Sequence, residues 1–523
     1  MTAPESSRWV LAVDLGTSGL KVGAVNLDGV VVDHVLRQVP TDFGEGATQD
    51  ADGWWTMVAE ATQEIAARGL VSPDGLVAVG LTGEWGSTVP VDADGATTGR
   101  VLLWRDDRGA KWSRERVGGP MAGYAPGAAL KFIRRTAGLP SANGADPTGH
   151  ALYLRHACPD QYARTTTLLE PVDYLALRFT GRRAATTASM IASWLTDNRK
   201  GAATGYVPSL VKAAGREADR LPELLPTGSI VGTITSEAAT QIGVPAGVPV
   251  VAGLPDLHSA WLGCGTPDHY QAHIAISTTA WVSCAVPFKK TDVMHQIASV
   301  PGVQPDQWLV VNNHETGGAC LQWLRDQIVR PADALPGEQP VGFDDLTALA
   351  AQAPAGSGGV LFTPWLAGER SPVDDRTLRG AFLNVSLRTD RAAMVRAVLE
   401  GVAYNARWLA EAVEKFVKQP LPSYRILGGG SVSDLWCQIH ADVMNRTIER
   451  VADPLHTNLR GVALYAAARV GVIEQADIAE RNRVERVFTP DPANRAEYDR
   501  LYGEYRALYG TVRKLYRRLN GPR

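Results

Sequence analysis

A polar turn rich in hydroxyl and glycine residues follows an apolar run near the start of the chain, and a similar turn recurs near its middle. The first turn, residues 14–19, follows residues 9–13, a short apolar run typical of a buried strand. The second, Ser277-Thr278-Thr279, lies between the apolar runs 272–276 and 281–286. Because this arrangement opens two halves of the sequence, it predicts a duplicated core. A chain of 523 residues also exceeds what one hydrophobic core usually supports, which favours two large domains.

The beginning of the first half has a clear strand and helix pattern. Runs of β-prone residues at 20–27 and 30–35 are joined by Asp28-Gly29, a dipeptide typical of tight hairpins. We therefore expect antiparallel strands here, followed by a helix over 52–68 and a buried strand over 76–81.

A segment rich in Gly and Pro, residues 243–255, separates the two halves. It surrounds an apolar run at 248–252, for which we predict a strand. We interpret this segment as the crossing into a second domain, which gives predicted domains of 1–252 and 253–523.

The second half contains the clearest helix of the chain, at residues 391–416, where apolar residues recur at steps of three and four. A strand at 424–427 then leads into Gly428-Gly429-Gly430, and a helix is expected over 432–444. A further helix of small residues, 458–470, is expected to pack against the helix at 432–444.

Several classes of protein are disfavoured by composition. The formal net charge is -3 and no basic stripe is present, so nucleic-acid binding is not expected. Five cysteines form no CxxC pair, which argues against a zinc or redox motif and favours reduced thiols. No apolar stretch reaches the ~18 residues of a membrane span, and residues 1–8 contain no apolar signal-peptide region. We expect a soluble cytoplasmic protein with no membrane partner.

The first polar turn carries groups that can bind phosphate. Its glycines allow the backbone to approach closely, while backbone amides and the hydroxyls of Thr17 and Ser18 can donate to phosphate oxygens. Asp14, at the end of the strand, could hold Mg²⁺ directly or through water, because Mg²⁺ prefers oxygen ligands. The alternative is a plain β-turn capped by Asp14.

Three other places could complete a phosphate-transfer site. Thr278 offers a second hydroxyl turn, and Gly428–Gly430 could let a nucleotide lie against the backbone near a helix N-terminus. Asp256 follows a predicted buried strand and could accept a proton from a hydroxyl that attacks a γ-phosphate. The structural alternatives are a hairpin tip, a tight strand–helix connection and a helix N-cap, respectively.

Taken in order, these segments resemble the FGGY carbohydrate kinases, and among them the xylulokinase branch. The resemblance implies an α/β, two-domain actin/hexokinase-like fold, each domain built on a ribonuclease-H-like sheet, with nucleotide and sugar in the interdomain cleft. It extends from about residue 10 to about residue 471. The segments that carry it are 14–21, 104–108, 170–181, 250–256, 277–280, 317–326, 368–405 and 428–442.

The resemblance also implies roles for individual residues. Asp256 becomes the catalytic base and a substrate contact, Asp14 the Mg²⁺ ligand, and Asp106 part of the substrate side. The expected cofactors are ATP and Mg²⁺. The residues assigned to nucleotide and phosphate are Asp14, Thr17, Ser18, Lys21, Thr278, Gly318, Gly429, Gly430 and Asp434.

Two segments depart from the family pattern. Where xylulokinases have glutamine-methionine-histidine-glycine, this chain has Glu84-Trp85-Gly86-Ser87, so a glycine replaces the sugar-contacting histidine. We predict that Glu84 and Trp85 set sugar choice, since a carboxylate accepts hydroxyl hydrogen bonds and an indole covers an apolar sugar face. Alternatively, Trp85 belongs to the domain core and Glu84 pairs with an arginine. The second departure is Leu254-Pro255, which precedes Asp256 in place of glycines.

The leading hypothesis is ATP-dependent phosphorylation of a ketopentose such as D-xylulose. A kinase for another polyol or sugar, of the glycerol, ribulose or gluconate type, remains open. So does an ATPase of the actin and heat-shock type, which would have no sugar acceptor. Asp256 and the segments 104–108 and 368–405 favour the kinase. A homodimer is also left open.

Overall fold

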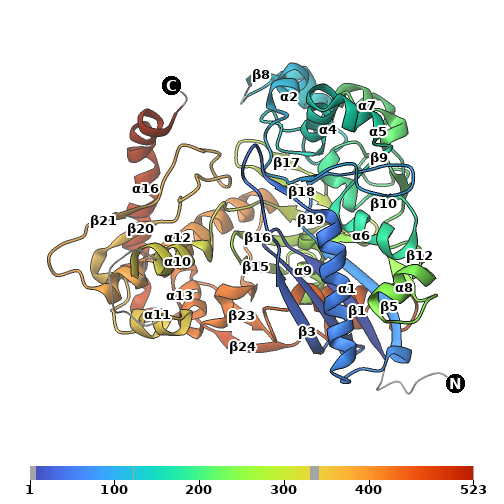
Figure 1. Cartoon of the computed structure of the whole chain (residues 1–523). Coiled ribbons are helices and arrows are strands. Elements are labelled where there is room, and N and C mark those ends of the chain that lie inside the picture. Colours follow the sequence, from blue (N-terminus) through green and yellow to red (C-terminus); the bar gives the residue numbers. More distant parts are fainter. Residues whose placement is uncertain (1–7, 122, 330–340, 522–523) are drawn as a thin grey trace.

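The computed structural model describes residues 8–121, 123–329 and 341–521, which form two large β-sheets flanked by helices (Figure 1). The first sheet has seven strands. Its spatial order is β12 (Ile230–Thr233), β13 (Pro249–Val251), β5 (Leu76–Gly83), β1 (Trp9–Leu15), β2 (Gly19–Asn26) and β3 (Val31–Gln38), with β14 (Leu254–Pro255) beside β5.

The second sheet has eight strands. Its spatial order is β17 (Thr291–Asp292), β18 (Ile297–Pro301), β19 (Trp308–Val311), β16 (Ala280–Val286), β15 (Ala272–Ile276), β22 (Ser423–Leu427), β23 (Thr447–Val451) and β24 (Val484–Phe488). Short two-stranded pairs lie outside both sheets: β4 (Thr48–Gln49) with β7 (Val101–Leu102), β6 (Val89–Val91) with β9 (Thr167–Leu169), β10 (Ala184–Thr186) with β11 (Glu223–Leu225), and β20 (Leu361–Thr363) with β21 (Ala381–Leu383).

The centres of the two sheets repeat one pattern. β1 pairs antiparallel with β2 and parallel with β5, so Val13 lies opposite Val22 on one side and Leu81 on the other. β15 likewise pairs antiparallel with β16 and parallel with β22. Each hydroxyl turn therefore joins the hairpin of its own sheet, as the two similar turns predicted.

Helices cover both sheets. Those of the first half are α1 (Ala51–Ala67), α2 (Ala110–Val117), α3 (Pro126–Ile133), α4 (Pro147–Ala157), α5 (Pro159–Arg164), α6 (Pro171–Thr180), α7 (Pro208–Ala214) and α8 (Ser236–Ile242). Those of the second half are α9 (Asp256–Cys264), α10 (Ala319–Trp323), α11 (Phe343–Ala350), α12 (Arg391–Val417), α13 (Asp434–Met444), α14 (Thr457–Arg469), α15 (Asp477–Glu480) and α16 (Arg495–Asn520). β8 (Gly118–Met121) follows α2.

One predicted helix contact is wrong. The helix predicted at 458–470 forms as α14, but it packs mainly on α9, β1 and β5, whereas α13 packs mainly on α12. Glycines permit the close approach of α14 to α9, since a Cβ on Gly263 would lie 2.0 Å from the Thr457 carbonyl oxygen. A Cβ on Gly461 would lie 2.0 Å from the Ser259 carbonyl oxygen. A segment from late in the chain thus completes the packing of the first sheet.

The strand at the crossing between the halves belongs to the first sheet, where β13 pairs parallel with β5. β14 also pairs with β5, and α9 begins directly after it. All strands of the first sheet lie within residues 9–255 and all strands of the second within residues 272–488. The helices do not follow this division, because α14, from the second half of the sequence, packs on the first sheet. A division between residues 252 and 253 stays a prediction.

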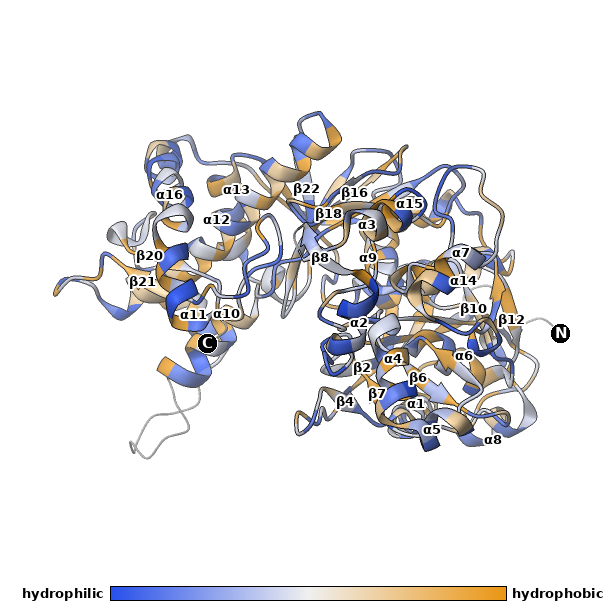
Figure 2. Ribbon diagram, turned by 90° about the horizontal axis from the view of Figure 1, so that it is seen from above, coloured by the Kyte–Doolittle hydropathy of each residue, from blue (hydrophilic) through white to orange (hydrophobic). Residues whose placement is uncertain are grey.

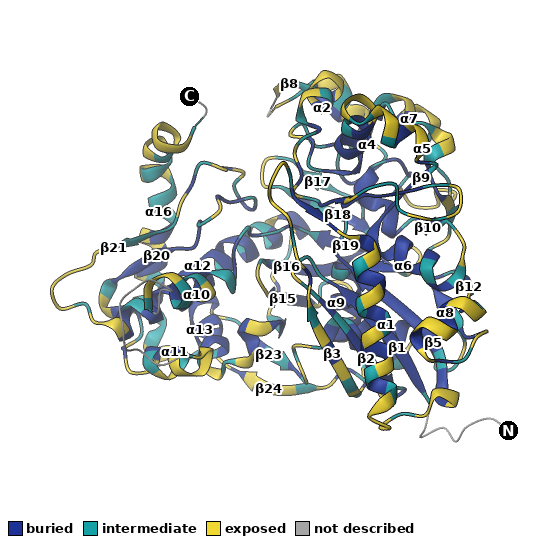
Figure 3. Cartoon of the chain, viewed as in Figure 1, coloured by how far each residue is buried: buried dark blue, intermediate teal, exposed yellow. Residues whose placement is uncertain are grey.

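The central strands of both sheets are largely buried (Figure 3). Their apolar side chains form the core together with those of the covering helices. One cluster lies between the first sheet and α1, another between the second sheet and α12, and a third joins α9 and α14 to residues of both sheets. Figure 2 shows apolar and polar residues alternating along the helices that cover the sheets. Within the described ranges, no helix is both long and apolar enough to cross a membrane.

Candidate active site

The end of β1 brings an acidic residue to the start of the first turn. Asp14 is buried on the strand opposite Lys21 of β2, and the Lys21 ammonium lies 3.5 Å from its Oδ2. The turn closes with a 3.0 Å hydrogen bond from Gly16 N to Gly19 O, which leaves Ser18 exposed. Sequence reasoning placed these residues together, and the fold does bring them together.

Asp256 is the first residue of α9 and follows β14, the two-residue strand that pairs with β5. The amide of Leu257 donates a 2.7 Å hydrogen bond to its Oδ1. Loss of hydration raises the pKa of Asp256 to about 7, and the negative charges of Asp14 and Glu84 add to this rise. Three carboxylates from separate parts of the sequence therefore share one region, where proton transfer near neutral pH is accessible to Asp256.

Glu84 is buried just beyond the end of β5 and links the first turn to residue 104. The Thr17 hydroxyl donates to its Oε2, and the Ser87 hydroxyl donates a 2.7 Å bond to its Oε1. The indole of Trp104 donates to Thr17 Oγ1 at 3.1 Å, and the Trp104 amide donates to Ser87 Oγ at 3.0 Å. These four bonds close a ring. Burial raises the pKa of Glu84, and the hydrogen bonds from Thr17 and Ser87 oppose that rise.

Trp85 and Asp106 lie near this ring but have different environments. Trp85 is half-buried and packs against the apolar cluster that joins both sheets. Asp106 is buried, and the Arg108 guanidinium donates to both of its carboxylate oxygens, at 2.6 and 3.0 Å. The carboxylate of Asp106 is thus already paired within the chain.

The second turn has its hydroxyl exposed. Thr278 lies at the tip between β15 and β16, and the Gly317 amide donates to its carbonyl oxygen at 2.9 Å. Gly318 N donates to Ser277 O at 2.7 Å, so the predicted residues Thr278 and Gly318 form one compact unit.

The glycine triplet lies against the end of β15. A Cβ on Gly428 would lie 2.6 Å from the Ile276 carbonyl oxygen, and one on Gly430 would lie 2.5 Å from the Ile276 side chain. Gly429 faces open space, because an added Cβ would meet no atom within 4 Å. Asp434, at the start of α13, is exposed and pairs with Arg450 at 2.6 Å and with Arg486. The triplet is therefore shaped by contact with β15, and Asp434 is engaged by arginines.

The two parts of the molecule that these residues come from match one protein family. Residues 9–263 match the model of the FGGY family of carbohydrate kinases, N-terminal domain, and residues 279–470 match that of the C-terminal domain. The chain belongs to the FGGY family of carbohydrate kinases. It is an ATP-dependent sugar kinase, as the resemblance implied.

Proteins similar to this kinase align with nearly its whole length. A xylulose kinase of Staphylococcus epidermidis is 26% identical over 502 residues, 94% of this chain and 95% of the relative. A gluconokinase of Bacillus subtilis is 23% identical over 90% of this chain and 89% of the relative. A crystal structure of a xylulose kinase from Lactobacillus acidophilus superimposes with a TM-score of 0.82 at 20% identity, covering 98% of this chain and all of that one. The predicted two-domain actin/hexokinase-like fold is confirmed.

Two arginines of this kinase lie beside Trp104, and the sequence predicts a role for neither. The guanidinium of Arg105 lies 4.4 Å from the Trp104 ring, and that of Arg370, from the other half of the chain, lies 5.6 Å from it. Arg370 Nε also pairs with Glu315 at 2.9 Å. Arg370 falls inside the recognised segment 368–405, yet only the fold places it against Trp104.

Glu170, for which the sequence also predicts no role, contacts the segment 84–87 that departs from the family pattern. The Gly86 amide donates a 2.8 Å bond to Glu170 Oε2, and Gly86 has a φ of +86°, in the left-handed region that favours glycine. Burial raises the pKa of Glu170 well above its ordinary value. Glycine at position 86 therefore has a backbone role of its own.

Proposed function

We propose that this kinase transfers the γ-phosphoryl group of ATP to a hydroxyl of a ketopentose, D-xylulose, with Asp256 as the base. The observation that carries the proposal is Asp256 itself, partly buried beside Asp14 and with a pKa of about 7. A carboxylate with that pKa can take the proton of the attacking hydroxyl near neutral pH. The relatives named xylulose kinase support xylulose as the acceptor.

In this proposal the sugar oxygen forms the new bond to phosphorus as the bond to the leaving ADP oxygen breaks. The proton of the sugar hydroxyl passes to Asp256. From the first turn, Ser18 would position the phosphates with its hydroxyl and Thr17 with its backbone amide, because the Thr17 hydroxyl already donates to Glu84. Thr278 with Gly318 would position them from the second turn. Gly429 and Gly430 would lie along the nucleotide. Because phosphoryl transfer needs little covalent work from the protein, the two turns contribute mainly by positioning and hydrogen bonding.

The residues present fit a magnesium ion. Asp14 offers carboxylate oxygens next to Asp256, and within the described ranges no group of three or more His, Cys, Asp or Glu residues could hold a metal alone. Mg²⁺ is usually held by one or two carboxylates together with phosphates and water. Asp14 would hold the ion, which neutralises phosphate charge when bound.

The role proposed for Glu84 differs from the direct contact with sugar hydroxyls that the sequence predicts. Both of its carboxylate oxygens already accept hydrogen bonds, from Thr17 and Ser87. We propose that it positions the first turn relative to Trp104, and that it influences sugar choice through this ring. Trp85 would contribute through its exposed part.

Gluconate is a second candidate acceptor, favoured by Arg105. This residue is exposed, lies over Trp104, and within the described residues has no carboxylate within 4.0 Å of its guanidinium. An exposed guanidinium without a paired carboxylate can bind a carboxylate group of a substrate. A relative named gluconokinase supports this alternative.

A coupled assay of ADP release tests both candidates, with D-xylulose, D-ribulose, gluconate and glycerol as acceptors. We expect ATP turnover only when an acceptor is added, with the highest kcat/KM for D-xylulose. Preference for gluconate that disappears in Arg105→Met would replace D-xylulose by the second candidate. Turnover that no acceptor changes would contradict the proposal.

A further inference from the structure

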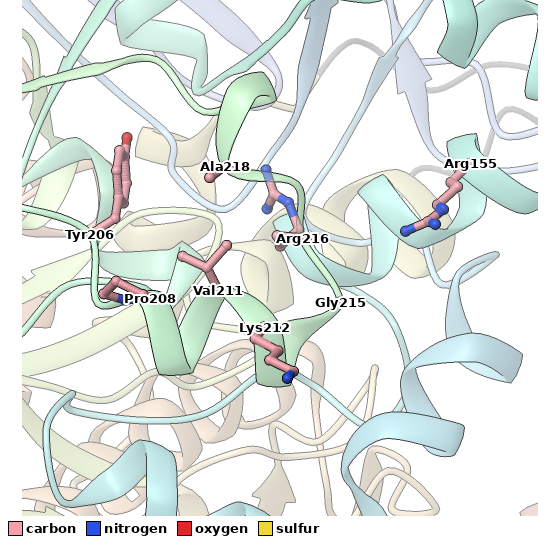
Figure 4. Close-up of a pocket in the computed structure, with 8 residues that line it drawn as sticks. All are labelled: Arg155, Tyr206, Pro208, Val211, Lys212, Gly215, Arg216 and Ala218. Atoms are coloured by element: carbon pink, nitrogen blue, oxygen red, sulfur yellow. The ribbon is translucent and has the colours of Figure 1, made fainter.

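A cavity of about 440 Å³ lies in the outer part of the first half, among α4, α7 and the turn after α7 (Figure 4). Its elements are distinct from β1, β5 and α9, which carry the active site, and Figure 1 shows α4 and α7 above the sheet. The lining side chains that matter here are Arg155, Tyr206, Pro208, Val211, Lys212 and Arg216.

Arg216 is the central feature of the cavity. It is only 8% exposed, and its guanidinium donates one 3.1 Å hydrogen bond to the Pro147 carbonyl oxygen. Among the described residues, no carboxylate lies within 4.0 Å of it. Burial lowers the pKa of this guanidinium. A buried cation without a paired anion is costly, so the site favours an anion from solution.

Other cations surround the same space. Figure 4 shows Arg155 on α4 and Lys212 on α7 on either side of Gly215 and Arg216. A Cβ on Gly215 would lie 3.0 Å from the Arg116 guanidinium carbon, so a fourth cation is adjacent.

Three carboxylates lie close to these cations. Glu217 Oε1 lies 3.3 Å from Arg155, and Glu217 Oε2 lies 2.8 Å from Arg220. The carboxyls of Asp146 and Glu170 also interact with the charge of Arg216. Burial raises the pKa of Asp146 to about 6, so it is mostly ionised at neutral pH, and raises the pKa of Glu170 well above its ordinary value. Positive charge therefore exceeds negative charge around the cavity.

We propose that this cavity binds a small sugar phosphate, the class of compound that the kinase itself produces. Guanidinium groups form bidentate hydrogen bonds with phosphate oxygens, and a lysine ammonium adds a compact positive charge. Tyr206, Pro208 and Val211 form an apolar wall that an inorganic ion alone would leave uncovered. The volume is in the range of small-ligand sites.

Helix α4 connects this cavity to the sugar side of the active site. It carries Arg155, and Arg216 bonds to its first residue, Pro147. From the middle of the same helix, His150 Nε2 lies 3.2 Å from the Asp106 carbonyl oxygen, and Nδ1 lies 3.0 Å from Thr88 Oγ1. Burial lowers the pKa of His150 to about 4, so the imidazole is neutral at physiological pH. We expect an occupied cavity to change the apparent KM for the sugar.

Binding is tested by calorimetry on the full chain with inorganic phosphate, ribose 5-phosphate and glucose 6-phosphate. A saturating non-hydrolysable ATP analogue is present, so that the phosphate turns of the active site are filled. We expect a sugar phosphate to bind more tightly than inorganic phosphate. The double variant Arg155→Met/Lys212→Met should weaken this binding at least tenfold, whereas Lys415→Met, an exposed lysine on α12, should leave it unchanged.

Arg216→Met would remove the central cation, but this side chain is buried and the variant can fail to fold. Arg155 and Lys212 lie at the exposed part of the cavity, so the double variant tests the proposal without this difficulty. The sugar phosphate that binds should also shift the KM for the acceptor in the parent and in Lys415→Met, but not in the double variant. Absence of binding by all three probes, or equal binding to parent and double variant, would overturn the proposal.

Discussion

The two hydroxyl turns occupy equivalent places in the two sheets, yet their side chains are held very differently. In the first turn, Thr17 donates to Glu84 and accepts from the Trp104 indole, so its hydroxyl is part of a closed ring. In the second turn, Thr278 is exposed, and among the described residues only its backbone carbonyl is engaged, by the amides of Gly317 and Ala319. The first turn is thus preorganised by its bonds to Glu84 and Trp104, whereas the exposed second turn would be free to meet a phosphate in the proposed function.

This difference teaches that one local pattern can serve two purposes. A shared strand–turn–strand unit places a hydroxyl at the end of each sheet, but distant residues decide whether that hydroxyl is occupied. Asp14 and Asp256 also lie beside the first turn, so the proton-transfer chemistry is expected on that side.

The largest expected effect comes from the carboxylate beside the first turn. Asp256→Asn should lower kcat by a factor on the order of 10²–10⁴, as expected for the loss of a general base. ATP and sugar affinities should change little, because the amide keeps the size of the side chain. Steady-state kinetics and calorimetry on the variant test this, and a kcat close to that of the parent would refute the assignment.

The next largest effects are expected from matched substitutions in the two turns. Thr17→Val removes a donor to a buried carboxylate, so it should raise the KM of both ATP and sugar, each by about tenfold. Thr278→Val should raise the KM of ATP by a similar factor and leave the sugar KM unchanged. Kinetics with each substrate varied in turn separate the two. Equal effects of both variants on the sugar KM would remove the distinction drawn between the turns.

Glu84 offers a sharper test of the ring. Glu84→Gln should raise the sugar KM several-fold and shift relative kcat/KM among acceptors, with the ATP KM at saturating sugar nearly constant. Trp85→Ala, a partly buried side chain, should cost about 1–3 kcal/mol of stability. Melting temperatures and acceptor preferences are measured on both. Unchanged preference in both variants would mean that this segment does not set sugar choice.

The smallest effect concerns pH. The pKa of Asp256 is raised from its ordinary value of 3.8 to about 7 in the fold, so folding favours its protonated form. Its contribution to stability is therefore complete below about pH 4 and is lost as the pH rises through about 7. Asp256→Asn cannot ionise and should be more stable than the parent by on the order of 1–2 kcal/mol at pH 8.

Denaturant unfolding at pH 5 and pH 8 checks the last expectation. The advantage of the variant should be larger at pH 8, and the same substitution at an exposed carboxylate, Asp107→Asn, serves as the control. A pH-independent difference would indicate that the pKa of Asp256 is not raised.

The sequence by itself determined the local elements and the family. The hairpin at Asp28-Gly29, the helix at 391–416 and the two hydroxyl turns follow from turn chemistry and apolar periodicity, which are local properties of the chain. The order of separated segments then indicated a carbohydrate kinase of the FGGY family, which the family models confirm.

Only the tertiary structure decided which distant residues meet. Periodicity reveals that a helix has a buried face but not which surface covers it, so the packing of α14 on the first sheet was missed. The ring from Thr17 to Glu84 and Trp104 joins residues up to 87 positions apart, and the stacking of Arg370 on Trp104 spans the two halves. Hydrogen bonds and charge interactions depend on distance in space, and a linear sequence does not contain that distance until the chain has folded.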